Sequence, residues 1–172
     1  MSPARRTVAI TGATGLIGRS LCQYFQRRGW TVRALIRDTS RYPFTAPRIE
    51  LYRADLPHAL DESALRRVDA VIHAAYATTA VRRENAKRVN EEGTMRVLEA
   101  SRAAGVRKFV FVSSFAAHAD ARSYYGQSKY ELEKRMDPER DLVLRPGLVL
   151  APAGGLFERL RHSVKSSVIV PL

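Results

Sequence analysis

Three glycines spaced three residues apart constrain the fold of this chain more than any other feature. Gly12, Gly15 and Gly18 directly follow the β-type run Thr7–Ile10, and an apolar pattern with helical spacing begins after them. A strand-to-helix turn that lies against a pyrophosphate needs residues without Cβ, and the helix N-terminus offers free N–H groups and a positive dipole end. The segment therefore predicts a dinucleotide site; the alternative is a glycine turn that caps a helix without a ligand. The residues expected to contact the dinucleotide here are Gly12, Thr14, Gly15, Leu16 and Ile17.

Strand-like and helix-like segments alternate along the chain, a pattern typical of a parallel sheet covered on both faces. We expect strands near residues 7–11, 31–36, 49–53, 70–73, 109–112 and 142–144. We expect helices over 16–28, shortly after Pro57, in a long segment that ends at Gly105, and over 124–136. Right-handed crossovers then imply an α/β fold with a doubly wound, Rossmann-like parallel sheet in the order 3-2-1-4-5-6.

Composition sets outer limits on the class of protein. The 172 residues, 45% of them hydrophobic, suffice for one domain with a sizeable core. The net charge of +12 arises from arginine pairs scattered through amphipathic segments, so we expect solvated helix faces and no specific nucleic-acid site. Cys22 is the single cysteine, which excludes an intrachain disulfide or a cysteine-based zinc site, and we expect no metal. Met1–Arg6 leads straight into the first strand, and no run approaches the ~18 apolar residues of a membrane span, so we expect a cytoplasmic protein without a membrane partner.

The spacing of the glycines also resembles one family. The usual dinucleotide fingerprint has its first two glycines two positions apart, whereas here they are three apart. This spacing is similar to that of the extended short-chain dehydrogenases/reductases, the NAD-dependent epimerases and dehydratases. Further segments match that family in the same order: Asp55–Leu56, Val71–Ala75, Asn90–Thr94, Val112–Ser114, Tyr125–Lys129 and Leu144–Gly147. The resemblance implies a dinucleotide-binding domain over 1–155 and the start of a substrate-binding region over 156–172.

Candidate catalytic residues follow the fifth expected strand. Tyr125 and Lys129 are four residues apart, so a helix places both side chains on one face. A free phenol has a pKa near ~10 and is a poor base at neutral pH, but an adjacent ammonium group favours the phenolate. Ser114, at the end of the strand, is placed to donate a hydrogen bond to a substrate oxygen. The resemblance implies the same three roles, and it adds hydrogen bonds from Lys129 to the nicotinamide ribose.

The end of the second expected strand should determine the cofactor. An acidic residue there hydrogen-bonds the adenosine ribose, whereas an arginine accommodates a 2′-phosphate. Arg37 comes directly after the apolar run and Asp38 follows it, so we expect NADP, with NAD as the alternative if Asp38 turns inward. Asp55, with Leu56, lies where the resembling family contacts adenine; Asp55 could also cap a helix that begins at Pro57.

The turn after the fourth expected strand should border the cofactor. The small Ala74 and Ala75 let the backbone lie against it, and the resemblance places them at the nicotinamide ribose, with Pro146 as a further contact. We expect His73, just before them, to be a hydrogen-bonded structural residue. By resemblance, Asn90 ties the long helix to the backbone of the active site.

These features lead to one predicted function and one alternative. The first is an NAD(P)-dependent oxidoreductase, epimerase or dehydratase acting on a carbonyl or hydroxyl substrate, with nucleotide sugars among the candidates. The alternative is a non-catalytic NAD(P)-binding sensor or scaffold. By resemblance, family members usually continue beyond the segment matched here into a substrate-binding region. In this sequence, only a helix-like run over 156–165 and a strand-like run over 167–170 follow that segment. We therefore expect dinucleotide binding with little turnover, and self-association of the strand-like run into a homo-oligomer.

Overall fold

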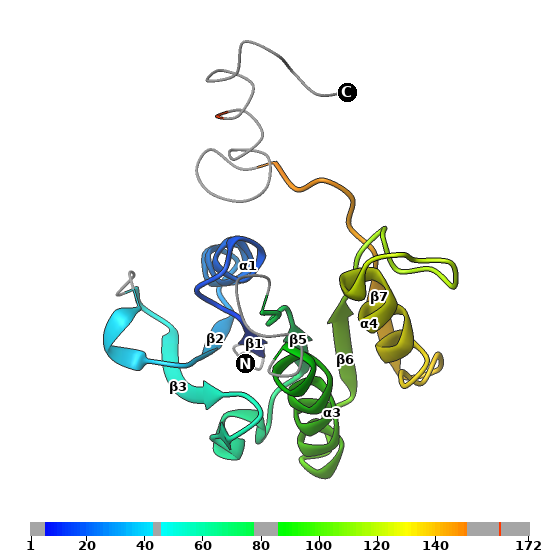
Figure 1. The fold of residues 1–172 in the computed structure, drawn as a ribbon. Coiled ribbons are helices and arrows are strands. Elements are labelled where there is room, and N and C mark those ends of the chain that lie inside the picture. Colours follow the sequence, from blue (N-terminus) through cyan, green and yellow to red (C-terminus); the bar gives the residue numbers. More distant parts are fainter. Residues whose placement is uncertain (1–5, 43–45, 78–85, 151–161, 163–172) are drawn as a thin grey trace.

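The computed structural model describes residues 6–42, 46–77, 86–150 and 162. Its sheet has the strand order β4-β3-β2-β1-β5-β6-β7 (Figure 1). Six of these strands are parallel and follow the predicted order: β1 (Thr7–Thr11), β2 (Thr31–Ile36), β3 (Ile49–Asp55), β5 (Ala70–His73), β6 (Lys108–Val112) and β7 (Asp141–Leu144). The doubly wound sheet predicted from the sequence is therefore confirmed.

Alternation along the strands divides the core into two layers. Val8 and Ile10 of β1 pack with the helix α1 (Leu16–Arg27), whereas Ala9 between them packs with the helix α3 (Gly93–Ala103) on the opposite face. Successive side chains of a strand point to opposite faces, so a central strand covered on both sides must be apolar throughout. The helix α4 (Tyr124–Glu133) joins the layer of α3 through Leu132.

The strand order has a switch point at β1, in the middle of the sheet. β1 pairs with β2 on one side and with β5 on the other, so the chain leaves β1 in one direction and later returns in the other. Ligands of such sheets bind at this switch point, outside the carboxyl ends of the strands. Thr11 of β1 and His73 of β5 are paired there, next to the glycine turn.

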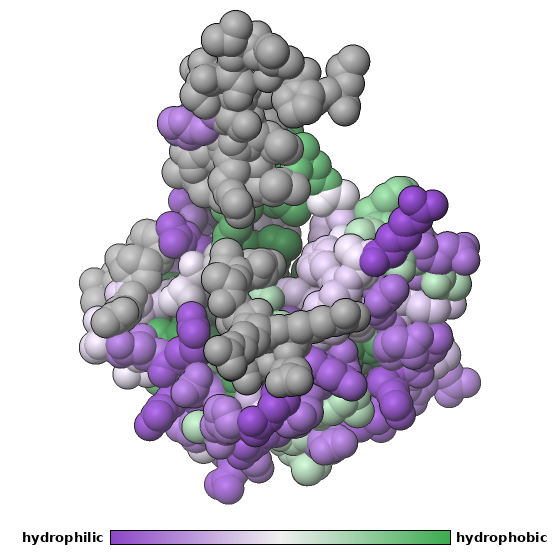
Figure 2. All heavy atoms as spheres, in the orientation of Figure 1, coloured by the Kyte–Doolittle hydropathy of each residue, from purple (hydrophilic) through white to green (hydrophobic). Residues whose placement is uncertain are grey.

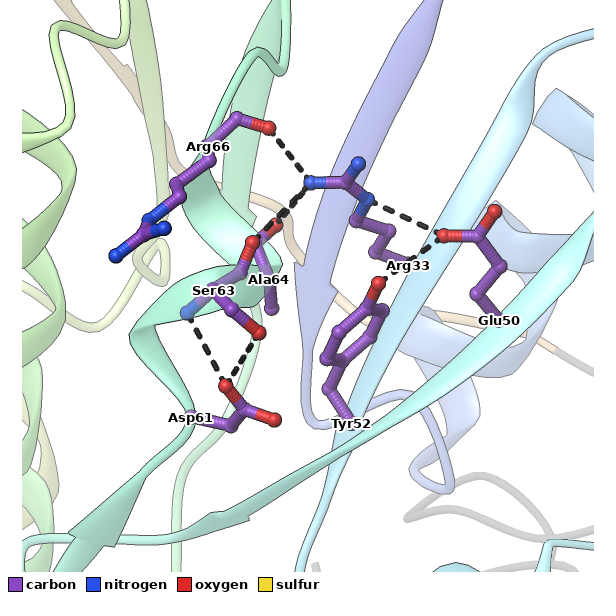
Figure 3. A network of polar contacts seen from close by, with 7 residues as sticks. All are labelled: Arg33, Glu50, Tyr52, Asp61, Ser63, Ala64 and Arg66. Carbon is purple, nitrogen blue, oxygen red and sulfur yellow. Dashed lines mark hydrogen bonds and ion pairs between the residues drawn. The ribbon is translucent and has the colours of Figure 1, made fainter.

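The predicted helix after Pro57 is wrong. Residues Ala59–Leu60 form β4, which pairs antiparallel with the end of β3, and a 3₁₀ turn, η2, follows over Glu62–Leu65. Arg33 explains part of this local structure (Figure 3). Its Nη1 donates to carbonyl oxygens at the end of η2, and its Nε donates to Glu50. The three carbonyls belong to Ser63, Ala64 and Arg66. A charged donor thus satisfies the free carbonyls of a short turn that the pattern of apolar residues does not specify.

The other helices differ from expectation at their ends. α1 ends at Arg27 and is followed by Gly29 at φ +82°, a left-handed conformation that favours glycine. α3 is preceded by a π-helical turn, η3 (Arg88–Glu92), and α4 stops at Glu133, three residues before the predicted end. A second 3₁₀ turn, η1 (Thr39–Arg41), follows β2.

Figure 2 shows hydrophilic residues spread over most of the described surface in that view. Within the described residues, no helix combines the length and the apolar character that a membrane crossing requires. The predicted helix over 156–165 and strand over 167–170 lie outside the described residues.

Candidate active site

The glycine turn fits closely against the end of β5. Gly12 has φ +66°, and a Cβ built on it would lie 2.7 Å from the nitrogen of Ala75 and 2.8 Å from the carbonyl carbon of Ala74. These neighbours are backbone atoms, so they cannot rotate out of the way. Gly12 is therefore required twice, by its conformation and by its contact with the Ala74–Ala75 backbone. The sequence predicted the glycine turn and the Ala74–Ala75 pair as parts of the site, but not that the two segments touch each other.

The other two glycines serve the start of α1. A Cβ on Gly18 would come within 2.2 Å of the Gly12 carbonyl oxygen, so Gly18 lets the helix pack onto the turn. Gly15 is exposed and is the N-cap of α1 without a side-chain cap, and its N–H donates to the Gly12 oxygen at 2.9 Å. The N–H groups of Leu16, Ile17 and Gly18 belong to the first helical turn and have no acceptor within the helix, whereas the Arg19 N–H donates to the Gly15 carbonyl oxygen. The turn thus presents backbone donors beside an exposed residue without Cβ, which fits a phosphate group.

His73 has a structural hydrogen-bonding role in the described chain. Its Nδ1 lies 2.8 Å from the Thr11 hydroxyl and its Nε2 lies 2.9 Å from the Thr94 hydroxyl. Thr94 donates its single hydroxyl proton to the Asn90 carbonyl, so it accepts from Nε2–H, and the imidazole is neutral with its proton on Nε2. Complete burial lowers the pKa of His73 to about 3, and the charge of Lys129 contributes further. This geometry agrees with the structural role expected for the residue.

Asn90 fixes the backbone that follows β5. Its Oδ1 accepts from the Ala77 N–H at 2.7 Å, and its Nδ2 donates to the Ala77 carbonyl oxygen at 3.3 Å. Asn90 is buried within the π-helical turn η3. The expected tie between this helix and the backbone at the site is therefore present, and it ends at Ala77.

Lys129 is a buried amine at the centre of the site. The residue is 2% exposed, and its Nζ donates to the Val112 carbonyl oxygen at 2.7 Å. The same Nζ lies 4.5 Å from the ring centroids of both Tyr76 and Phe111. Burial lowers the pKa of Lys129 to about 7, against the opposing effect of the Glu133 carboxylate one turn further along α4. A group with this pKa exchanges its proton near neutral pH.

Tyr125 lies in the first turn of α4 and is 36% exposed. Its ring packs edge-to-face on Tyr76, with centroids 5.0 Å apart and an interplanar angle of 88°. Tyr125 and Lys129 therefore contact the same ring, that of Tyr76, from two positions on one helix. Sequence reasoning missed Tyr76; the signal available was an aromatic residue directly after the two small alanines.

Ser114 is half-buried in the loop after β6. Its Oγ accepts from the Ala116 N–H at 3.2 Å, which shapes the loop. The start of α4 approaches this loop closely, because a Cβ on Gly126 would lie 2.4 Å from the Ala116 carbonyl oxygen. Ser123 caps the helix by accepting from the Gly126 N–H at 3.1 Å. These contacts bring the loop that carries Ser114 and the turn that carries Tyr125 together.

An ion pair between the exposed Arg145 and the largely buried carboxylate of Glu133 holds α4 against the end of β7. The Arg145 Nε lies 2.9 and 3.1 Å from the two oxygens of the Glu133 carboxylate, and the Arg145 Nη2 and the Ser113 hydroxyl also donate to this carboxylate. The Glu133 side chain is 8% exposed. One residue further along, the Pro146 carbonyl accepts from the Phe115 N–H at 3.0 Å. The segment with Arg145 and Pro146 is thus fixed to the loop and the helix that bear the candidate catalytic residues.

The expected adenine side has fewer fixed contacts. Arg37 is exposed at the end of β2, and Asp38 accepts hydrogen bonds from the N–H and the hydroxyl of Ser40 at the start of η1. Asp55 is the last residue of β3 and pairs with Ala59 in the antiparallel ladder. No helix begins at Pro57 in this described segment, so the expectation that Asp55 caps one is wrong. Leu56 is buried, and a Cβ on Gly93 would lie 2.9 Å from the Leu56 Cβ.

A family model fits most of the chain. Residues 8–140 match the NAD dependent epimerase/dehydratase family. The chain belongs to that family. The match starts in β1, before the glycine turn, and ends after α4, so it includes the elements that carry Ser114, Tyr125 and Lys129.

Relatives of known name and structure agree with this assignment. The chain is 39% identical over 170 residues to a ceramide reductase of Caulobacter vibrioides, covering 93% of this chain and 53% of that protein. A crystal structure of the Bordetella bronchiseptica enzyme WbmH in complex with NAD+ superposes with a TM-score of 0.76 at 18% identity, covering 94% of this chain and 63% of that one. MoeE5 in complex with UDP-glucose and NAD also gives a TM-score of 0.76, at 23% identity, covering 94% and 61%.

These comparisons confirm the family and the fold predicted from the sequence. At their low identities, the two solved structures bear on the fold alone. The chain spans about half the length of the Caulobacter relative.

Proposed function

We propose that this protein is an NAD(P)-dependent oxidoreductase, epimerase or dehydratase in which Tyr125 is the general acid/base. The observation that carries the proposal is the arrangement of Tyr125 and Lys129 on one helix, around one ring, beside the end of β6. The glycine turn lies at the carboxyl end of the adjacent strands of the same sheet. Family membership supports this class of reaction without fixing the substrate.

The residues around the glycine turn fit a dinucleotide. The N–H groups of Leu16 and Ile17 and the exposed Gly15 would hold the pyrophosphate. The Ala74–Ala75 backbone would lie along the nicotinamide side, and Asp55 with Leu56 along adenine. When bound, the cofactor supplies hydride transfer to or from a substrate carbon.

Each candidate catalytic residue has its own proposed role. Tyr125 exchanges a proton with the substrate oxygen, and its partial exposure leaves the hydroxyl accessible. Lys129 places its amine against the ring on which Tyr125 packs, and it would donate to the ribose. Ser114 donates a hydrogen bond that holds the substrate oxygen near Tyr125.

For the cofactor, we propose NADP rather than NAD, because Arg37 is exposed where a 2′-phosphate would lie and Asp38 is occupied by Ser40. The test is to measure the dissociation constants of NADPH and NADH for the parent and for Arg37→Asp. Tighter NADPH binding in the parent and a reversed order in the variant support the proposal. Equal constants in the parent contradict it, and tighter NADH binding would favour NAD, the cofactor named for the family.

Activity is tested with a panel of substrates. The panel contains ketones and aldehydes with apolar chains, because a relative is a ceramide reductase, and nucleotide sugars, because MoeE5 binds UDP-glucose. Tyr125→Phe removes the transferable proton and should lower kcat by about 10²–10⁴-fold with cofactor affinity nearly unchanged. Tyr130→Phe is the matched control, since it removes a phenol from the same helix, where Lys134 lies 4.5 Å from the ring. Similar turnover in Tyr125→Phe and Tyr130→Phe would contradict the assignment of the proton transfer.

The alternative function is an NAD(P)-binding sensor or scaffold. Saturable dinucleotide binding without turnover of any panel member would favour it. We also propose that the chain forms a homo-oligomer, which the solution mass tests directly.

A further inference from the structure

Tyr76 has a defined place that neither the motifs nor the proposed chemistry uses. It follows the Ala74–Ala75 pair beyond the end of β5 and is half-buried. The next residue, Ala77, is held at both its N–H and its carbonyl by Asn90. The backbone next to Tyr76 is therefore held in place.

The ring contacts both members of the candidate catalytic pair. The Lys129 Nζ lies 4.5 Å from its centroid, and the Tyr125 ring packs on it at 5.0 Å, nearly perpendicular. A protonated amine is attracted to the negative face of an aromatic ring, more strongly when it is removed from water. Lys129 is 2% exposed and its described hydrogen bond goes to the Val112 carbonyl oxygen, so the rings of Tyr76 and Phe111 supply much of its remaining surroundings.

The hydroxyl of Tyr76 contributes less than its ring. It is buried beside the Ser128 hydroxyl, and neither oxygen makes a hydrogen bond of good geometry within the described chain. Burial raises the pKa of Tyr76 to about 12, with smaller contributions from Tyr124, Tyr125 and Glu91, so the residue stays neutral at working pH. A phenylalanine would therefore reproduce what Lys129 and Tyr125 contact.

We propose that Tyr76 is a positioning residue, whose ring holds the Lys129 ammonium and the Tyr125 ring in register. This role rests on the proposed function, in which those two residues carry the chemistry. Without the ring, the buried ammonium loses an attractive partner and Tyr125 loses the surface that orients it.

The other charged and titratable groups near Lys129 come from α4 and β5. Glu133 lies on α4 itself and favours the ammonium form. His73 comes from β5 and is neutral, since its pKa is about 3. Tyr125 lies one turn before Lys129 on α4. A change at Tyr76 removes the ring on which Tyr125 packs and leaves the described hydrogen bonds of His73 and Glu133 in place, so a shift in the titration of Lys129 reports on the loss of the ring.

The test is an NMR titration of the chain labelled with ¹³Cε-lysine, without cofactor or substrate. The sequence has five lysines, and Lys129→Arg identifies the Lys129 resonance. Tyr76→Phe should keep the parent pKa, whereas Tyr76→Leu and Tyr76→Met should lower it by about one pH unit, because they lose the cation–π contact. Phe109→Leu is the matched control, since it removes a buried ring of the same core that does not lie over Nζ.

The outcomes separate this inference from the proposed function. An unchanged or raised pKa of Lys129 in Tyr76→Leu and in Tyr76→Met, with either variant folded by circular dichroism, overturns the role of Tyr76 even if the enzyme is active. An equal drop in Phe109→Leu also overturns it, because the effect would then be general loosening of the core. Failure of Tyr125→Phe to affect turnover would instead overturn the proposed function and leave the titration result standing.

Discussion

Replacing Gly12 by alanine tests the close contact between the glycine turn and β5. The variant adds one methyl group at a residue with φ +66°, 2.7–2.8 Å from backbone atoms of Ala74 and Ala75. Gly105 offers a matched control on the same chain. It has φ +72°, and a Cβ built on it would meet nothing within 4 Å. Both substitutions force a side chain into the left-handed region, and Gly12→Ala alone adds the collision.

The magnitudes separate the two effects. An alanine in the left-handed region destabilises the folded chain by about 1–2 kcal/mol. The lower entropy of the unfolded variant offsets a fraction of this loss, so Gly105→Ala should lower the free energy of unfolding by about 1 kcal/mol. Overpacking that moves the backbone adds about 1–3 kcal/mol, so Gly12→Ala should cost about 2–4 kcal/mol in total. For a chain of this length, each 1 kcal/mol lowers Tm by about 2–4 °C.

The assay is urea unfolding of the parent and both variants, followed by circular dichroism, with thermal melts as a second measurement. The predicted result is a clearly larger loss of unfolding free energy for Gly12→Ala than for Gly105→Ala. Equal losses would show that the turn and the Ala74–Ala75 backbone separate easily, and would refute the argument that Gly12 is needed for this contact.

Three further predictions concern buried polar groups and a helix cap. Lys129→Met should stabilise the chain at pH 7 by about 1–3 kcal/mol, because the amine is charged in the unfolded state whereas its folded pKa is about 7. Urea unfolding between pH 7 and 10 should show that this gain shrinks as pH rises, since the unfolded amine loses its own charge near pH ~10.4. Because the folded pKa of His73 is about 3, the parent should lose stability as pH falls from ~6.5 toward 3, where the unfolded state binds a proton that the folded state does not; thermal melts should show a weaker dependence in His73→Gln. Ser123→Ala removes the N-cap of α4 and should cost about 1 kcal/mol in urea unfolding, and an unchanged midpoint would show that the cap at Gly126 contributes nothing.

The sequence predicted the central strands well because strands buried on both faces are continuous apolar runs, which are easy to recognise in a sequence. β1, β2 and β5 occupy the expected residues, since strands covered on both faces must be apolar throughout. β4 is only two residues long, too short to show a period, and was predicted as a helix. Its place depends on pairing with β3 and on the Arg33 contacts nearby, which are set by tertiary structure.

The candidate site shows the same division. Motif spacing placed Tyr125 and Lys129 on one helix, and the structure has them there. It could not reveal that both contact Tyr76, because that contact joins segments about fifty residues apart through folding. The role of Asp55 as a helix cap failed with the helix itself, whereas the three roles assigned to Ser114, Tyr125 and Lys129 remain predictions.

The measurement that tests the central claim most directly is calorimetric titration of NADPH and NADH into the 172-residue chain. All the residues expected to hold the dinucleotide lie within the described segments, so the chain should bind it saturably, with one site per chain. A folded chain that binds neither dinucleotide at millimolar concentration would contradict the claim that the glycine turn, the Ala74–Ala75 backbone and Lys129 form a cofactor site.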